Sequence, residues 1–279
     1  MRKHIQGIDH VVFAVRDLDF AGDTFTRMGF TVTPRGFHSL GSQNRCVMFA
    51  ETYLELLWLP PKMKSRPFIA DFLARGGEGL AAVALKTGDA RKAQAELQAA
   101  GLDPTEPMDF SRPVELPEGS RDAKFRTLDI GPAHVPCGRL FLCQHLTPEV
   151  VWRPEWQRHA SGVTALAAMA VISADVAATT GAYERVFDTS ARDIAEGRLI
   201  ETGTASIAVA SGKSLANRLP GVWIAARPAP LIAALFIRVA DRALAEKQLR
   251  SGGFHPARMP DGSLAVGAAE AHGVAMVFG

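Results

Sequence analysis

Two sets of side chains alternate along residues 8–15, as they do in a β-strand whose two faces meet different surroundings. One set is bulky and suits packing under a helix, and it consists of Val11, Phe13 and Val15. The other set is smaller and carries an imidazole, and it consists of Ile8, His10, Val12 and Ala14. The second face therefore suits the wall of a cavity.

A helical spacing follows this strand directly. Apolar residues recur three or four positions apart, at Leu18, Ala21, Phe25 and Met28. Asp17 precedes them and can cap the exposed amides of a helix, and Gly29 is a natural stop. The sequence thus predicts a strand followed by a capped helix.

The same arrangement recurs three times further along the chain. Asp89, Asp175 and Asp241 each precede a helical pattern, and apolar residues stand four and six positions before each of them. Gly101 and Gly253 end two of these patterns, whereas Asp188 stands at the end of the third. Short strand-like runs follow each helix, among them residues 43–50 and 53–59, 123–130 and 139–146, 198–202 and 205–210, and 263–267 and 274–278. Each unit therefore consists of a strand, a helix and about three further strands. The pattern predicts an α+β fold of four βαβββ units.

Residues 147–160 separate the second unit from the third. Their prolines and tryptophans predict an extended connector rather than a helix or a central strand. Trp152 and Trp156 either close the mouth of the first pair of units or join the two pairs, and joining is the favoured interpretation. Two modules result, a first pair over residues 1–146 and a second, structural pair over residues 161–279.

Composition and charge narrow the class of protein. A formal net charge of +2 over 279 residues does not favour binding to nucleic acid or to an anionic membrane. No apolar run reaches the length of a membrane span, and residues 1–7 lack the apolar core of a secretion signal. The three cysteines, at positions 46, 137 and 143, have no spacing typical of a disulfide framework or a metal site. We therefore expect a cytoplasmic protein with reduced thiols.

Several stretches resemble the vicinal oxygen chelate superfamily, and in particular its glyoxalase-like domain branch. They are Asp9-His10-Val11-Val12-Phe13-Ala14-Val15, Asn44-Arg45-Cys46-Val47-Met48-Phe49, Tyr53-Leu54-Glu55-Leu56, Cys143-Gln144-His145-Leu146-Thr147-Pro148-Glu149 and Trp152-Arg153-Pro154-Glu155-Trp156. The superfamily includes glyoxalase I, extradiol dioxygenases and the bleomycin- and fosfomycin-resistance proteins. The resemblance implies paired half-barrel modules around a divalent metal that the substrate chelates through neighbouring oxygens.

His10 and Glu55 are the metal ligands that this resemblance implies. Alanine occupies the position of His10 in the other three units, so the strand folds without an imidazole there. Glu55 lies inside an apolar strand, where an unpaired carboxylate is costly to bury. The alternatives are a hydrogen-bonded histidine in a polar cavity and an ion pair between Glu55 and Arg45 or Arg139. Glu55 is also the candidate catalytic base.

Two ligands are fewer than a catalytic metal site usually has, and Ala82 stands where the superfamily draws a further ligand from the second unit. His145 can supply a third ligand from the last strand of that unit, or it can hold the following Thr147-Pro148 turn. Two histidines and one carboxylate suit zinc, iron, manganese or nickel.

The remaining candidates are residues expected to contact substrate. His38, Asn44 and Arg45 lie in a polar stretch that reads either as the rim of the cavity or as a solvated loop. Tyr53 and Phe141 are expected to line the cavity. The second pair has alanine at both histidine positions, so we expect it to hold no metal and to be structural or dimer-forming.

Two classes of function fit these features. The first is a divalent-metal-dependent enzyme of lyase, isomerase or dioxygenase type acting on a small oxygen-bearing metabolite. The second is a non-catalytic protein that binds or sequesters a small molecule in the same half-barrel. Both classes predict a small-molecule substrate or ligand, and both are compatible with a homodimer.

Overall fold

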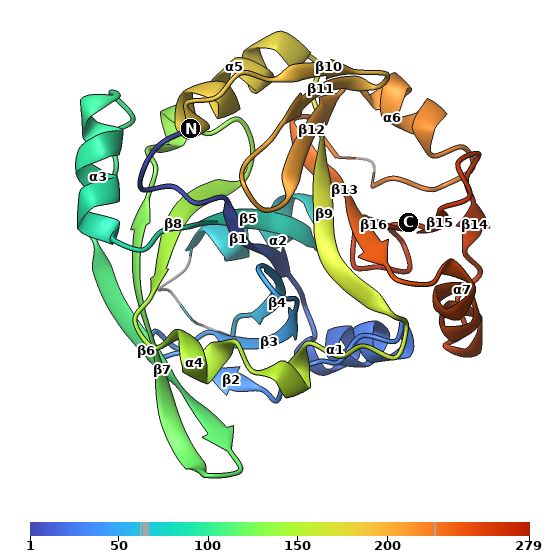
Figure 1. Cartoon of the computed structure of the whole chain (residues 1–279), viewed down its shortest axis with the longest axis horizontal. Helices are drawn as coiled ribbons and strands as arrows, with labels where there is room; N and C mark the ends of the chain where they lie inside the picture. Colours follow the sequence, from blue (N-terminus) through green and yellow to red (C-terminus); the bar gives the residue numbers. More distant parts are fainter. Residues whose placement is uncertain (62, 64–66, 226) are drawn as a thin grey trace.

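Two eight-stranded sheets form the framework of the chain in the computed structural model, which describes residues 1–61, 63, 67–225 and 227–279 (Figure 1). The first sheet draws all its strands from residues 8–145 and the second from residues 163–278. Each sheet contains two units of a strand, a helix and three further strands. The predicted α+β fold of four βαβββ units in two paired modules is confirmed.

The first sheet has the strand order β2-β3-β4-β1-β5-β8-β7-β6. Its strands are β1 (Ile8–Ala14), β2 (Gly36–Phe37), β3 (Gln43–Met48), β4 (Tyr53–Trp58), β5 (Gly79–Lys86), β6 (Met108–Leu116), β7 (Gly119–Asp129) and β8 (Arg139–His145). The first strands of the two units, β1 and β5, pair antiparallel at the centre, and each pairs parallel with the last strand of its own unit. The two units are therefore related by an internal twofold arrangement.

The second sheet repeats this order as β10-β11-β12-β9-β13-β16-β15-β14. Its strands are β9 (Val163–Ile172), β10 (Arg192–Ile194), β11 (Gly197–Ile200), β12 (Ser206–Ala210), β13 (Leu231–Val239), β14 (Ala257–Arg258), β15 (Leu264–Val266) and β16 (Ala275–Phe278). Here β9 and β13 are the central antiparallel pair.

Four helices follow the first strands of the four units, as predicted. They are α1 (Leu18–Arg27), α3 (Ala90–Ala99), α5 (Val176–Phe187) and α7 (Arg242–Ser251). The carboxylate of the preceding aspartate accepts backbone N–H hydrogen bonds at the start of each one. Gly29 follows α1 with a φ of +86°, and Asp188 takes the same left-handed conformation, with a φ of +53°, where α5 has no glycine.

Three other helices were not predicted, and one of them corrects the expected connector. Residues 147–160 contain α4 (Pro148–Val151) and a 3₁₀ turn, η2 (Pro154–Trp156), so the extended connector was wrong in part. Proline at the first position of each turn accounts for this, because proline is favoured at a helix start. The other two are α2 (Pro67–Gly76) and α6 (Gly212–Arg218), and a second 3₁₀ turn, η1, spans Pro132–His134.

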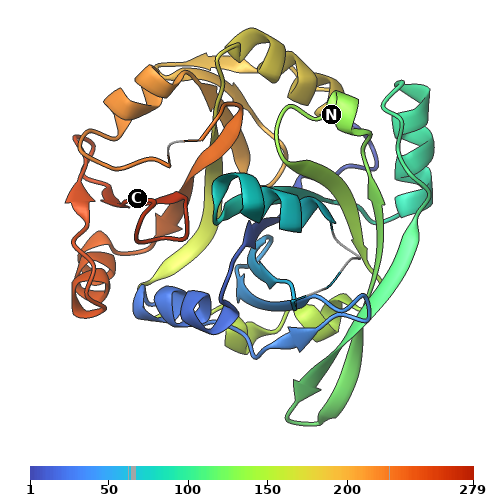
Figure 2. The same cartoon turned by 180° about the vertical axis from the view of Figure 1, so that it is seen from behind.

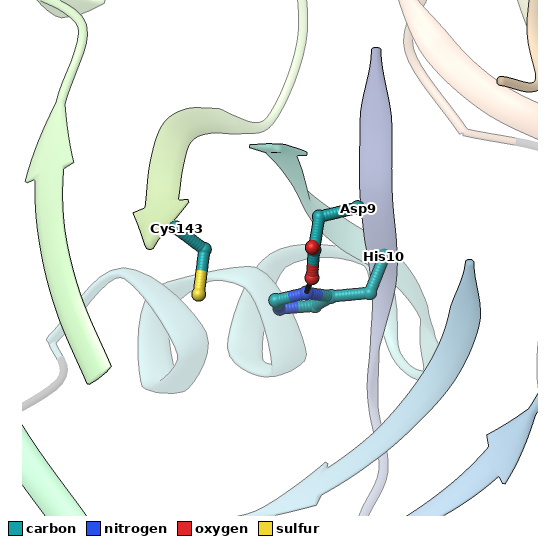
Figure 3. Close-up of side chains that lie close together, drawn as sticks. All are labelled: Asp9, His10 and Cys143. Atoms are coloured by element: carbon teal, nitrogen blue, oxygen red, sulfur yellow. Dashed lines mark hydrogen bonds and ion pairs between the residues drawn. The ribbon is translucent and has the colours of Figure 1, made fainter. Parts of the chain in front are cut away.

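Strand β1 departs from regular alternation at Asp9. Its pairing with β5 shifts between Ile8 and His10, so Asp9 is the extra residue of a β-bulge. Ile8 consequently packs in the core on the helix side of the sheet, whereas Asp9 and His10 lie together and hydrogen-bond to each other (Figure 3). The expectation that Ile8 shares a face with His10 is wrong for this reason.

One large apolar cluster joins the two halves of the chain. It takes in the helix-side faces of both sheets together with the buried sides of α1, α3, α5 and α7. Phe30 from the first half and Phe278 from the second lie in it with their ring centroids 6.0 Å apart. Among the described residues, none of the helices combines the length and the apolar character needed to cross a bilayer.

The inner face of the first sheet curves until its two edge strands meet. Backbone hydrogen bonding joins them where the Ser39 N–H, just after β2, donates to the Ser111 carbonyl on β6, at 2.8 Å. The β6–β7 hairpin then extends past the body of the molecule (Figure 2). Helix α2 packs against the inner-face cluster through Phe68, Phe72 and Leu73. The first sheet is thus nearly closed into a barrel.

Candidate active site

A cavity of about 320 Å³ lies on the inner face of the first sheet. Polar side chains from β1, β3, β4, β6, β7 and β8 enter it beside aromatic ones. Its lining is His10, His38, Leu40, Asn44, Tyr53, Glu55, Phe68, Met108, Phe110, Arg112, Phe125, Thr127, Asp129, Arg139, Phe141 and Cys143. A mostly enclosed volume with a few convergent polar groups is typical of a small-molecule site.

His10 is held on three sides. Its Nδ1 lies 2.7 Å from Asp9 Oδ1, and its ring stacks on Tyr53 with centroids 4.3 Å apart and planes 19° apart. Its other nitrogen, Nε2, lies 3.8 Å from Glu55 Oε2. The side chain of His10 is nearly fully buried. The structure therefore brings the two candidate ligands together and orients the imidazole before any ligand arrives.

Glu55 occupies the adjacent strand β4 and is equally enclosed, at 7% exposure. Asn44 Nδ2 donates to Glu55 Oε1 at 2.6 Å, and His38 Nε2 lies 3.7 Å from the same oxygen. His38 is in turn held by Ser42, whose Oγ is 2.9 Å from His38 Nδ1. His38 and Asn44, both expected at the rim, thus lie inside the cavity against Glu55.

Asp9 is completely buried between two imidazoles. Its Oδ1 lies 2.7 Å from His10 Nδ1 and 3.0 Å from His145 Nε2. Burial alone would raise the pKa of Asp9, but the charge of His145 and the hydrogen bonds from both rings outweigh burial and hold that pKa well below its usual range. Asp9 is therefore an ionised carboxylate that fixes which nitrogen of His10 faces Glu55.

We expect an Asp9→Asn variant to respond less to acid than the wild type. Because folding lowers the pKa of Asp9, its ionised form stabilises the fold above the ordinary value of 3.8, and this contribution is lost as the pH falls through the lower, folded value. The difference in unfolding free energy between wild type and variant should therefore narrow between about pH 5 and about pH 2 in urea titrations. An Asp23→Asn variant on the exposed side of α1 is the control, and a constant difference for Asp9→Asn would contradict the assignment.

The twofold arrangement of the sheet identifies the positions equivalent to His10 and Glu55. Glu55 pairs with the residue two positions after His10, and the same register in the second unit places Phe141 opposite Ala84, two positions after Ala82. Ala82 and Phe141 therefore complete the symmetric set of four positions, and neither can bind a metal. Only two of these four positions, His10 and Glu55, carry side chains that can bind a metal.

A third donor lies close by in Cys143. Asp9, His10 and Cys143 each offer one ligand atom, and these atoms lie within 4.8 Å of one another (Figure 3). Burial raises the pKa of the Cys143 thiol well above its ordinary value, so an ion would have to displace its proton. Two ligands about 2.1 Å from a tetrahedral zinc lie about 3.4 Å apart. The 3.8 Å between His10 and Glu55 therefore fits a shared divalent ion after a small movement.

Two of the expected site residues lie elsewhere. Arg45 is adjacent to Asn44 on β3, so its side chain leaves on the opposite face, where it donates to Asp19 at 3.0 Å. The expected position of Arg45 at the cavity is wrong. His145 lies behind Asp9 rather than on the cavity wall, with Nε2 directed to that carboxylate. The geometry places it as a partner of Asp9 instead of a third ligand around Glu55.

Trp152 also corrects an expectation. Its ring contacts Tyr53, with centroids 5.6 Å apart, and both Trp152 and Trp156 pack against the inner-face cluster of the first sheet. The two tryptophans therefore pack on the first module, and the favoured interpretation that they join the two modules was wrong.

Three charged residues of the site were not singled out from the sequence: Asp9, which supports His10, and the cavity residues Arg112 and Asp129. Asp9 was missed because strict alternation places it on the helix side, and only the bulge brings it to His10. Arg112 and Asp129 come from β6 and β7, and β6 lies outside the runs that were predicted as strands. The spacing of Phe110, Arg112 and Val114, with the polar residues Asp109, Ser111 and Glu115 at alternate positions, is the signal that would have found the arginine.

The inner face of the second sheet carries small apolar residues at all four corresponding positions. Ala168 and Ala234 stand where His10 does, and the register places Ala208 and Val277 where Glu55 does. These side chains offer no ligand atoms. The candidate chemistry is thus confined to the first half of the chain.

Comparison with known proteins agrees with the fold. The solved structure of a hypothetical protein from Staphylococcus aureus has a TM-score of 0.68 and 14% identity, covering 98% of both chains. A variant of 4-hydroxymandelate synthase from Streptomyces coelicolor has a TM-score of 0.60 and 16% identity, covering 99% of this chain and 92% of its own. A xylose isomerase-like TIM barrel/4-hydroxyphenylpyruvate dioxygenase fusion protein has a TM-score of 0.57 and 14% identity, covering 98% and 49%.

At these identities the likeness concerns the fold alone. No curated protein matches this sequence. Residues 8–187, which include both candidate ligands and most of the chain, match the family described as the glyoxalase-like domain. The chain belongs to the glyoxalase-like domain family of the vicinal oxygen chelate superfamily.

Proposed function

We propose that this protein is a divalent-metal-dependent enzyme of lyase, isomerase or dioxygenase type that acts on a small oxygen-bearing metabolite in the cavity of the first sheet. One observation carries the proposal. The Asp9 carboxylate holds Nδ1 of His10, and the opposite nitrogen of the same ring faces Glu55 at 3.8 Å. A carboxylate on the far nitrogen is the usual support of a metal-binding histidine.

The residues of this chain would divide the work as follows. His10 and Glu55 would hold the ion, with Cys143 as a further donor on the side of His10, and zinc, iron, manganese and nickel suit such a set. When bound, a divalent ion supplies Lewis-acid polarisation of a substrate oxygen. Asn44 donates to Glu55 and so fixes the direction of its carboxylate. Aromatic side chains form much of the cavity wall, and Trp152 packs against one of them, Tyr53.

The alternative is a protein that binds its ligand without transforming it. Ala82 and Phe141 favour it, because they leave the symmetric set of positions with two ligands in place of four. A binding protein would keep its affinity for the small molecule after removal of the metal. A metal-dependent enzyme would lose its activity on that molecule under the same conditions.

Metal binding is the direct test. The purified chain, freed of metal with a chelator, should take up about one equivalent of zinc, iron(II), manganese or nickel, and its melting temperature should rise with the concentration of that ion. A Glu55→Gln variant preserves the shape and the acceptor for Asn44 but removes the charge, so it should bind the ion more weakly. If the wild type takes up none of these four ions stoichiometrically, the metal-dependent proposal is overturned.

A further inference from the structure

The most unusual group in the cavity is the guanidinium of Arg112. It lies on β6 in the inward row that also contains Val114 and Leu116, and its side chain is 5% exposed. Among the described residues, Arg112 Nε has no hydrogen-bond partner, and no carboxylate lies within the 4.0 Å of an ion pair. A buried cation with no carboxylate at ion-pair distance is costly, so its position at a cavity wall points to a bound anion.

The other arginine in the cavity is already neutralised. Arg139 on β8 hydrogen-bonds to Asp129, and its guanidinium also stacks on Phe141, 4.5 Å from the ring centroid. Arg139 therefore shapes the wall and leaves no demand for a further anion. Of the two arginines in the cavity, Arg112 is therefore the one that an anionic ligand would neutralise.

The backbone beside Arg112 is shaped to leave it room. A Cβ on Gly36 would lie 3.1 Å from Arg112 Cδ and 2.5 Å from Asn44 Oδ1. These separations are shorter than ordinary van der Waals contact, so a side chain at position 36 would displace both groups. The absence of a side chain there keeps the guanidinium beside the polar end of the cavity.

The surfaces next to Arg112 are aromatic. Phe110, two residues before it on the same face, stacks on Phe125 with centroids 5.1 Å apart and planes 22° apart. Both rings line the cavity. A ligand that meets Arg112 with an anionic group would place its remaining atoms against these rings, and such surfaces suit a flat apolar body.

We propose that the cavity binds a small carboxylic acid, with the carboxylate on Arg112 and an apolar body against Phe110 and Phe125. One planar guanidinium presents a fork of donors that matches a carboxylate, whereas a phosphate dianion would call for further cations. The volume of about 320 Å³ limits the ligand to a small molecule. This inference rests on the proposed function in taking the same cavity as the substrate site, and it names the substrate class.

Benzoate and benzamide are the matched probes, because they differ in charge and share a shape. Isothermal titration of the chelator-treated, metal-free chain should give at least about 10-fold tighter binding of benzoate. Arg112→Met should abolish this preference, and Arg112→Lys, which keeps the charge without the fork, should retain part of it. Arg121→Met, at an exposed arginine paired with Glu149, is the matched control and should bind as the wild type does.

A second pair of variants guards against misfolding of Arg112→Met. Gly36→Ala should weaken benzoate by about 10-fold through crowding of Arg112, while Gly181→Ala, where nothing lies within 4 Å of the added atom, should not. Equal affinity for the two probes, failure of both to bind, or an unchanged preference in Arg112→Met would overturn the inference. Stronger binding of phenylphosphonate than of benzoate would overturn the carboxylate assignment. The metal-free conditions separate these results from the uptake of metal.

Discussion

Replacing His10 by alanine should abolish stoichiometric binding of a divalent ion. The variant loses the imidazole nitrogen that faces Glu55 at 3.8 Å, and neither Ala82 nor Phe141 can replace it from the symmetric positions. Asp9→Asn keeps the imidazole but loses the carboxylate that orients it. Its affinity should fall by about 10- to 100-fold, the usual effect of changing the outer partner of a metal-binding histidine.

This graded series separates a ligand from its support. Competition titrations with a chromophoric chelator should rank the affinities as wild type, then Asp9→Asn, then His10→Ala. His134→Ala is the control, because it removes an imidazole that is paired with Asp103 outside the cavity. An His10→Ala protein that binds one ion as tightly as the wild type would mean that the ion is held elsewhere.

Phe13→Ala should lower the free energy of unfolding by about 3 to 5 kcal/mol. Phe13 is fully buried on the helix side of β1, and its ring meets Phe25 of α1 edge-on with centroids 5.4 Å apart. Truncation removes most of the ring and leaves a cavity that rigid sheet and helix neighbours fill only in part. A loss of this size approaches the total stability of many domains, about 5 to 15 kcal/mol.

The control for this substitution is an exposed phenylalanine on the helix against which Phe13 packs. Phe20 of α1 is 60% exposed, so Phe20→Ala should change the unfolding free energy by no more than about 0.5 kcal/mol. Urea titrations of both variants at neutral pH provide the measurement. Similar losses for the two would show that burial in the joint cluster does not govern the stability of β1.

The fold could be predicted from the sequence because its signals are local and repeated. Each aspartate cap stands directly before its helix, and each apolar pair stands at a fixed distance before the cap. The assignment of strand and helix in one unit therefore supports the same assignment in the other units. Helix α2 carries no such signal, since it begins at Pro67 with no capping aspartate, and it was missed.

The candidate site could be predicted only in part, because its details depend on pairing between distant strands. His10 and Glu55 follow from one strand each. The bulge that brings Asp9 beside His10 exists only in the register of β1 against β5. Likewise, Arg45 was chosen although alternation on β3 allows Asn44 inside and excludes its neighbour, and the arginines that line the cavity are Arg112 and Arg139.

The apolar cluster that both sheets share indicates a structural role for the C-terminal half. A polypeptide severed at the connector would leave each fragment with one wall of a common interior turned to water, which favours self-association over independent refolding. The half that carries the cavity therefore depends on the other half to bury its side of the shared apolar cluster. Heat should consequently melt the molecule in one cooperative step, and a calorimetric trace with a single peak is the signature of that dependence.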